Sequence, residues 1–253
     1  MTNSRPVMHP FADSYRVNGD QADAFLMLHG WTGSPAHFRL AADFVNRRGY
    51  TAYVPRLAGH GTSLEHMQET TRKDWVKSAL EALYELSEFD RVHLVGLSMG
   101  GIIGLLLAAT NDVASITTIN SPQRLHSRRA WLARLMRGSK RIDAGEPSAV
   151  PHGEAARYWV HYEGSPVGTV ADLLDLMDAA EHALPRITAP AVIIQSHADE
   201  TVHPQSAQII HDGLSSAEKR IVWLERSRHV ALLDAERDRI HQEILFQATW
   251  TAH

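Results

Sequence analysis

The stretch Gly96-Leu97-Ser98-Met99-Gly100 decides how this chain is interpreted. It follows the apolar run 91–95 and precedes the apolar segment 101–109, so the pattern predicts a strand, a tight turn and a helix. Glycines two places on either side of Ser98 let the backbone turn sharply without a clash between the strand and the helix. The hydroxyl group of Ser98 is then exposed at the apex, an arrangement called a nucleophile elbow. A glycine-rich turn with an inert serine is the alternative, and the flanking apolar segments argue against it.

Two later strands supply partners for such a serine. A serine nucleophile needs a base that takes its proton and an acid that orients the base, and after a nucleophile elbow these follow in the order acid, histidine. The predicted strand 191–196 leads into a loop with Asp199, and the predicted strand 220–224 is followed by His229. Parallel strands place such loops at one edge of a sheet, where ligands bind. We therefore predict a catalytic triad of Ser98, Asp199 and His229.

Other ionisable residues compete for these roles. Glu200 is the alternative acid, but a shift of one residue at a strand end points a side chain elsewhere. His229 also begins a His-x-x-x-x-Asp string that ends at Asp234, a spacing found in some acyltransferases; Asp234 more simply begins or caps the last helix. His93 lies inside a strand and is interpreted as a packed core residue. No histidine pair has the HExxH form or another compact ligand spacing with carboxylates, so no metal site is predicted.

An oxyanion hole is the third requirement for hydrolysis through a tetrahedral intermediate, which needs two N–H donors aimed at the developing charge. One donor comes from the residue after the nucleophile, here Met99. The other comes from the loop after an early strand. The apolar segment 24–28 is interpreted as that strand and leads into the glycine-containing loop 29–33. We predict the backbone N–H of Trp31 as the second donor, while its indole ring can also roof the pocket.

Strands alternate with helices along most of the chain, which predicts a doubly wound, mainly parallel sheet of the α/β class. A helix is expected from Pro35 to Arg48 with Ser34 as its N-cap, and another from Thr71 to Ser87. Strands are expected at 15–17, 24–28, 51–54, 91–95, 115–120, 191–196 and 220–224. The alternation is interrupted by residues 123–186, which we interpret as a helical cap (lid) insertion. The α/β core then comprises residues 1–122 and 187–253.

The first part of the insertion is basic and amphipathic. Its cations, with no acidic residue among them, are Arg124, Arg128, Arg129, Arg134, Arg137, Lys140 and Arg141. Its apolar side chains are Leu125, Trp131, Leu132, Leu135 and Met136. Two interpretations stay open: a solvated helix whose apolar side covers the pocket, or a segment that makes transient contact with an anionic membrane surface.

The second part of the insertion, residues 170–178, has helical spacing with Leu173, Leu174 and Met177 on one side. These three residues are predicted to bind an acyl chain, although ordinary packing between cap and core explains them equally well. Tyr158 and Trp159 are predicted to belong to the same apolar substrate-binding wall.

Five ordered motifs resemble those of the bacterial monoacylglycerol lipases and related thermostable carboxylesterases. They are HGWTG at 29–33, RLAGHG at 56–61, GLSMGG at 96–101, DETV at 199–202 and SRHV at 227–230. The resemblance extends from about residue 20 to the C-terminus, but residues 123–185 contain no matching motif. It implies an α/β-hydrolase fold and cleavage of carboxylic esters through an acyl-enzyme on Ser98, without a cofactor. The expected substrate is a small ester with an apolar acyl chain.

Composition agrees with a globular enzyme and excludes some other functions. The chain has 253 residues, a net charge of −4 and no cysteine, so general nucleic-acid binding, disulfides and thiolate sites are not expected. Its start lacks an apolar stretch of signal-peptide length, and we expect a cytoplasmic protein. The same apparatus can cleave thioesters or carbon–carbon bonds or transfer acyl groups, and some proteins of this fold are non-catalytic receptors. The oligomeric state stays open.

Overall fold

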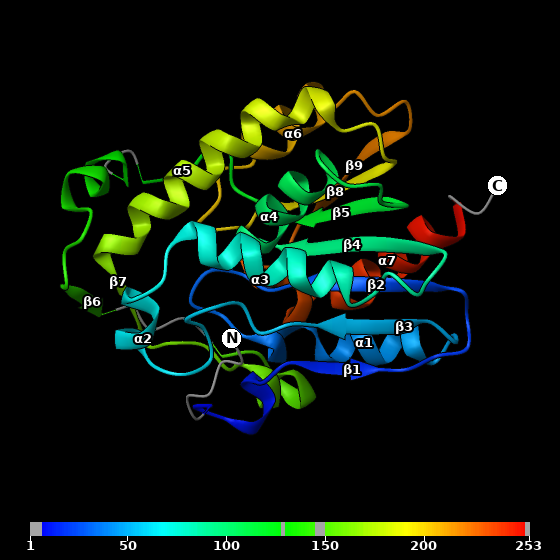
Figure 1. Cartoon of the computed structure of the whole chain (residues 1–253), viewed down its shortest axis with the longest axis horizontal. Coiled ribbons are helices and arrows are strands. Elements are labelled where there is room, and N and C mark those ends of the chain that lie inside the picture. The colour runs from blue at the N-terminus through cyan, green and yellow to red at the C-terminus, as the bar shows by residue number, and fades with distance from the viewer. Residues whose placement is uncertain (1–6, 128–129, 145–149, 251–253) are drawn as a thin grey trace.

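A seven-stranded sheet forms the centre of the structure, a computed structural model that describes residues 7–127, 130–144 and 150–250 (Figure 1). In spatial order its strands are β1 (Tyr15–Val17), β3 (Thr51–Val54), β2 (Asp23–Leu28), β4 (Arg91–Leu97), β5 (Ser115–Ile119), β8 (Ala191–Ser196) and β9 (Lys219–Leu224). The edge strand β1 pairs antiparallel with β3, and the other neighbours are parallel. The predicted doubly wound, mainly parallel sheet is thereby confirmed.

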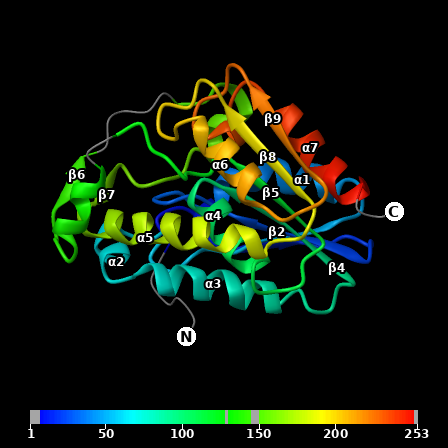
Figure 2. The same cartoon turned by 90° about the horizontal axis from the view of Figure 1, so that it is seen from above.

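Helices cover both faces of this sheet (Figure 2). One face carries α3 (Arg72–Tyr84), α4 (Met99–Ala108), α5 (Val167–Ala183) and α6 (Gln205–Gly213), and the other carries α1 (Arg39–Asn46) and α7 (Arg237–Trp250). Every residue of β2, β5 and β8 is therefore buried, as expected for central strands covered on both sides. His93 in β4 is buried as predicted, and its Nδ1 lies 2.8 Å from the Ser115 hydroxyl.

The segment after Ser34 differs from its prediction as a single helix. It forms a short 3-10 helix, η2 (Pro35–Phe38), and then α1. Ser34 does not cap either helix, because its Oγ donates to the carbonyl oxygen of Val160 at 2.6 Å. This long-range bond replaces the local cap, and it ties the start of the helix to the insertion. At the other end, Gly49 adopts φ +87°, which terminates the helical segment as expected.

The insertion 123–186 contains several short elements and one long helix. It comprises η3 (Ala130–Met136), η4 (Gly153–Tyr158), the antiparallel pair β6 (Ile142–Ala144) and β7 (Gly164–Pro166), α5, and η5 (Leu184–Arg186). In the described part of residues 123–141 the helical structure is a 3-10 helix, whereas one of the two interpretations from the sequence was a solvated amphipathic helix. Trp131, Leu132, Leu135 and Met136 lie exposed, whereas Leu125 and Ala133 pack partly buried against the core. In the described part of the chain, no helix is long and apolar enough to cross a membrane.

The basic segment is not a free cationic surface, which corrects the interpretation of its charge. Helix α5 presents an acidic residue every third position, and these pair with the arginines that precede it. The pairs are Arg124–Glu181, Arg134–Asp178, Arg137–Asp175, Arg137–Asp172 and, with an arginine of α3, Arg72–Asp172. Arg141 pairs locally with Asp143. Arg128 and Arg129 lie outside the described residues. Much of the positive charge is therefore neutralised within the molecule.

Candidate active site

Ser98 lies at a sharp turn between β4 and α4, with φ +54° and ψ −121°. This positive φ is strained for a residue with a side chain, and such strain is typical of functional sites. The flanking glycines make the turn possible. A Cβ at Gly96 would lie 2.3 Å from the backbone nitrogen of Gly101, and a Cβ at Gly100 would lie 1.9 Å from the carbonyl oxygen of Leu28. Strand and helix therefore approach each other as closely as the predicted elbow requires.

The three predicted triad side chains form one hydrogen-bonded chain. His229 Nε2 lies 3.0 Å from Ser98 Oγ, and its Nδ1 lies 2.9 Å from Asp199 Oδ2. The Asp199 side chain is fully buried, and its Oδ1 also accepts from the backbone N–H groups of Thr201 and Val202 at 2.8 and 2.9 Å. Each side chain follows the C-terminal end of a parallel strand: β4, β8 or β9.

The protonation state of His229 follows from these contacts. An ionised Asp199 only accepts hydrogen bonds, so Nδ1 carries the proton and Nε2 presents a lone pair to the Ser98 hydroxyl. Burial lowers the pKa of His229, but the Asp199 charge and its hydrogen bond outweigh burial, and the pKa is raised above 6.5. The imidazole is thus oriented to take a proton from Ser98 and stabilised once it holds that proton.

Several hydrogen bonds fix the loop that carries His229. Asn120, at the end of β5, donates from Nδ2 to the carbonyl oxygen of His229 at 2.9 Å, while its Oδ1 accepts from Ser196 N–H. The Glu236 carboxylate accepts from three consecutive backbone N–H groups, those of residues 225–227. Burial raises the pKa of Glu236, but these hydrogen bonds lower it to about 2. The backbone approaching His229 is therefore held by an ionised carboxylate and by an asparagine.

The loop 29–33 lies directly against Ser98. A Cβ at Gly30 would lie 3.3 Å from Ser98 Cβ, so only glycine lets the loop approach this closely. Two hydrogen bonds of the His29 ring fix this loop. Its Nδ1–H donates to the carbonyl of Gly30 at 2.9 Å, and its Nε2 accepts from Leu57 N–H at 3.2 Å. Burial lowers the pKa of His29 well below 6.5, so the imidazole stays neutral. Met99, the other predicted oxyanion donor, opens α4, where first-turn N–H groups lack partners within the helix.

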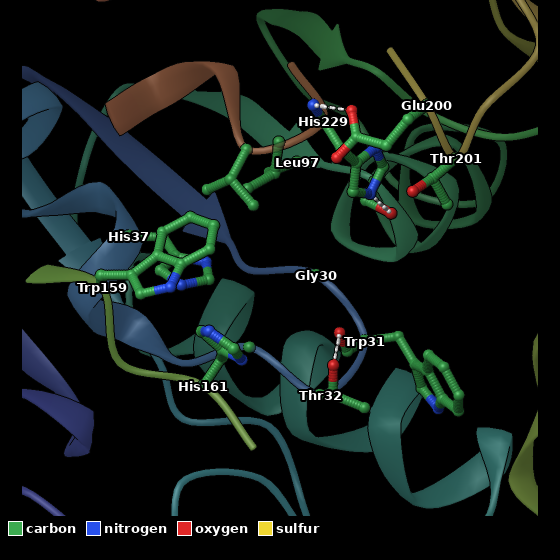
Figure 3. A pocket seen from close by; sticks show the side chains of 13 residues that line it. Gly30, Trp31, Thr32, His37, Leu97, Trp159, His161, Glu200, Thr201 and His229 are labelled. Atoms are coloured by element: carbon green, nitrogen blue, oxygen red, sulfur yellow. Dashed lines mark hydrogen bonds between the residues drawn. The ribbon is translucent and has the colours of Figure 1, made fainter. Parts of the chain in front are cut away.

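A cavity of about 180 Å³ lies beside these groups (Figure 3). Its lining combines two of the predicted triad residues, the loop 29–33 and parts of the insertion: Gly30, Trp31, Thr32, Gly33, His37, Leu97, Ser98, Trp159, His161, Glu200, Thr201, His229 and Val230. Trp31 lines it and donates from its indole N–H to Thr169 Oγ1 at 3.2 Å, which links the loop 29–33 to α5. Of the five residues predicted to bind substrate, Trp159 belongs to this lining.

The other four predicted substrate-binding residues do not line this cavity. Leu173, Leu174 and Met177 are buried in the hydrophobic core between α5 and α4, so their helical spacing reflects packing. Tyr158 packs on Phe11, with ring centroids 5.2 Å apart. An acyl-binding role for these four residues stays a prediction.

Two competing acids occupy other positions. Glu200 accepts from the backbone N–H of His229 at 3.2 Å and lines the cavity, while the imidazole Nδ1 lies against Asp199. Asp234 lies before α7, and its carboxylate accepts hydrogen bonds from the backbone N–H and the side-chain Nε of Arg228. In the described residues, no group of three or more His, Cys, Asp or Glu is arranged to hold a metal ion.

Sequence reasoning did not identify Asn120, His37 or His161 as parts of the site. The sequence did contain an indication for Asn120, because a polar residue that follows the carboxyl end of a central strand lies at the ligand-binding edge of the sheet. His37 and His161 carried none, since they are 124 positions apart and meet only through the folding of the insertion over η2.

Comparisons with known proteins agree with this geometry. The model of the alpha/beta hydrolase family matches residues 25–242. A thermostable monoacylglycerol lipase of Bacillus sp. (strain H-257) is 35% identical over 97% of this chain and 97% of its own length. A carboxylesterase of Bacillus subtilis (strain 168) is 30% identical over 89% of this chain and 91% of its own. The solved structure of a metagenome-derived lipolytic enzyme, from work on LipS and LipT, superposes with a TM-score of 0.88 at 33% identity, covering 95% and 98% of the two chains.

Proposed function

This chain belongs to the alpha/beta hydrolase family and is a carboxylic ester hydrolase, and we propose that it acts through an acyl-enzyme formed on Ser98. The observation that carries this proposal is the continuous chain of hydrogen bonds from Asp199 through His229 to Ser98. Nucleophile, base and orienting acid are the three roles that such a mechanism requires.

In the proposed mechanism, His229 Nε2 takes the hydroxyl proton as Ser98 Oγ attacks the ester carbonyl carbon. The imidazolium then gives this proton to the leaving alcohol, and the C–O bond of the ester breaks. His229 next takes a proton from water, whose oxygen attacks the acyl carbon, and returns it to Ser98 as the acid departs. Asp199 keeps the proton on Nδ1 and balances the transient positive charge.

The N–H groups of Trp31 and Met99 are proposed to stabilise the tetrahedral oxyanion. Two observations support this assignment: Gly30 permits the loop 29–33 to lie against Ser98, and Met99 occupies the positive end of the helix dipole of α4. Loss of one such donor typically costs a factor of about 10²–10³ in kcat.

Monoacylglycerols are the proposed substrates, supported by the name of one relative, the monoacylglycerol lipase of Bacillus sp. (strain H-257). The test is kcat/KM on p-nitrophenyl esters of increasing acyl length and on 1-monoacylglycerols of matching chains, with Ser98→Ala as the blank. Activity that extends to monoacylglycerols supports the proposal, whereas activity confined to short p-nitrophenyl esters contradicts it. A wild type equal to the blank on every ester would refute the Ser98 mechanism.

We also propose that residues 123–186 act as a cap and that its exposed apolar side chains touch lipid surfaces transiently. Trp131 and Leu135 in η3 are 59% and 78% exposed, next to Leu132 and Met136. Because the described arginines nearby are largely paired, this contact depends on apolar side chains more than on charge. The double variant Trp131→Ser, Leu135→Ser should lower co-sedimentation with phosphatidylcholine vesicles, and unchanged binding contradicts the proposal. A cytoplasmic location stays a prediction from the sequence.

A further inference from the structure

His37 is a buried polar residue that the mechanism does not use. It lies in η2, its side chain lines the cavity beside Ser98, and the residue is only 3% exposed. Neither ring nitrogen has a hydrogen-bond partner among the described residues. Burying a polar group without a partner costs free energy, so such a group at a cavity wall calls for a ligand.

Two aromatic residues of the insertion complete the wall around His37. The Trp159 indole stacks on the imidazole, with ring centroids 5.9 Å apart and planes 26° apart. His161 meets Trp159 edge-on at 4.9 Å, and its ring lies 6.5 Å from that of His37. Figure 3 shows these three side chains together on one side of the cavity, with His229, Glu200 and Thr201 on the other. We call His37, Trp159 and His161 the imidazole wall.

The imidazole wall is held rigidly against the oxyanion loop. Ser34 Oγ donates to the carbonyl of Val160 at 2.6 Å, and Tyr162 N–H donates to the carbonyl of Thr32 at 3.0 Å. These bonds fix residues 159–162 beside η2. Gly33 leaves room for the ring, since a Cβ there would lie 3.0 Å from Cε1 of His37. The unpaired nitrogens are thus part of a built site.

We propose that the imidazole wall binds the hydroxyl groups of the alcohol portion of the ester, so that it selects esters of a polyol such as glycerol. This proposal rests on the proposed function, because it places the alcohol of the substrate next to Ser98. The cavity of about 180 Å³ is smaller than the usual ligand pocket of about 300–1,000 Å³, so it suits a polar head group better than a long acyl chain.

The chemistry of the two imidazoles matches neutral hydroxyl groups. Burial lowers the pKa of His37 to about 3, with smaller contributions from His161 and His229, so the ring is neutral at working pH. A neutral imidazole offers one N–H donor and one lone pair, which complements a hydroxyl group that both donates and accepts. His161 Nδ1 donates to the carbonyl of Tyr162 at 2.8 Å, which leaves its Nε2 lone pair for a second hydroxyl. The neutral ring of His37 offers no positive charge to a carboxylate or phosphate.

The test compares two esters that differ only in the hydroxyl groups of the alcohol. These are 1-octanoylglycerol and propyl octanoate, and the measured quantity is the ratio of their kcat/KM values. The wild type is expected to favour the glyceryl ester, and His37→Phe should lower the ratio about tenfold or more, since it keeps the ring and removes both polar atoms. His37→Asn, which retains a donor and an acceptor, should recover part of the preference. His161→Phe should also lower the ratio.

The exposed His152→Phe carries the same substitution outside the cavity and should leave the ratio unchanged. A wild-type ratio near one contradicts the proposal, as does a ratio within twofold of the wild type in a folded His37→Phe enzyme. If His37→Phe does not fold, His37→Asn and the less buried His161→Phe decide the outcome by the same ratio. Failure of the Ser98 mechanism is distinguishable, because it would remove activity on propyl octanoate as well.

Discussion

Glu236 offers the sharpest prediction about stability, because one ionised carboxylate holds the backbone that leads to His229. Replacing it with Gln removes the charge and turns a donor toward N–H groups that need an acceptor. Burial raises the pKa of Glu236, but the N–H groups of residues 225–227 lower it from 4.5 to about 2. That lowering is equivalent to about 3.4 kcal/mol in favour of the charged form. Because the carboxylate is only partly shielded from solvent, we expect Glu236→Gln to cost about 2 kcal/mol.

The pH dependence of this loss has a definite sign. The folded-state pKa of Glu236 lies below the unfolded-state value, so its contribution is complete above about pH 4.5 and is lost as the pH falls toward 2. Urea unfolding at pH 7 and pH 3 measures the free-energy difference between wild type and variant, which should shrink to less than half at pH 3. The exposed Glu88→Gln, which breaks a surface pair with Arg16, should cost less than about 0.5 kcal/mol. A loss from Glu236→Gln below about 0.5 kcal/mol, or one equal at both pH values, would refute the reasoning.

Four further predictions concern the active site. Asp199→Asn should lower kcat about 10⁴-fold. In the wild type, Asp199 outweighs burial and raises the pKa of His229, so kcat/KM on a neutral ester should rise with pH through an apparent pKa above 6.5. An apparent pKa at or below 6.5 would contradict this. Gly100→Ala would place a Cβ 1.9 Å from the Leu28 carbonyl oxygen and should lower the Tm by about 10 °C or prevent folding. In the control Gly104→Ala, the new Cβ meets only the flexible end of Ile116 at 3.1 Å, and the Tm should shift by a few degrees at most. Asn120→Ala removes a hydrogen bond to the His229 carbonyl and should lower kcat about tenfold with little change in KM for p-nitrophenyl octanoate; an unchanged kcat would mean that His229 is held without it.

The sheet and the elbow were predictable because their signals are local. Apolar runs such as 191–196 form the buried strands, and the glycines around Ser98 are required within the same short turn. The chain order of acid and histidine after the elbow identified residues that the structure brings within hydrogen-bond distance. The order of the motifs therefore predicted a site whose residues lie far apart in the sequence.

The insertion was harder to predict because its structure depends on contacts between distant residues. Ser34 has the side chain of an N-cap, yet it bonds to Val160, 126 positions later. The arginines and lysine of residues 124–141 form a basic segment with no acidic residue in the sequence, but the carboxylates that pair with Arg134 and Arg137 are on α5. Leu173 and its neighbours have the spacing of an apolar face, and spacing alone does not distinguish an acyl site from core packing.

The central claim is that Ser98 is the nucleophile, and covalent labelling tests it most directly. A p-nitrophenyl alkylphosphonate should react with the wild type when Ser98 Oγ attacks phosphorus, p-nitrophenolate leaves and His229 takes the serine proton. Intact-protein and peptide mass spectrometry should find one adduct, on the peptide that contains Ser98, and none in Ser98→Ala. An adduct on another residue, or an unlabelled wild type that still hydrolyses esters, would contradict the account.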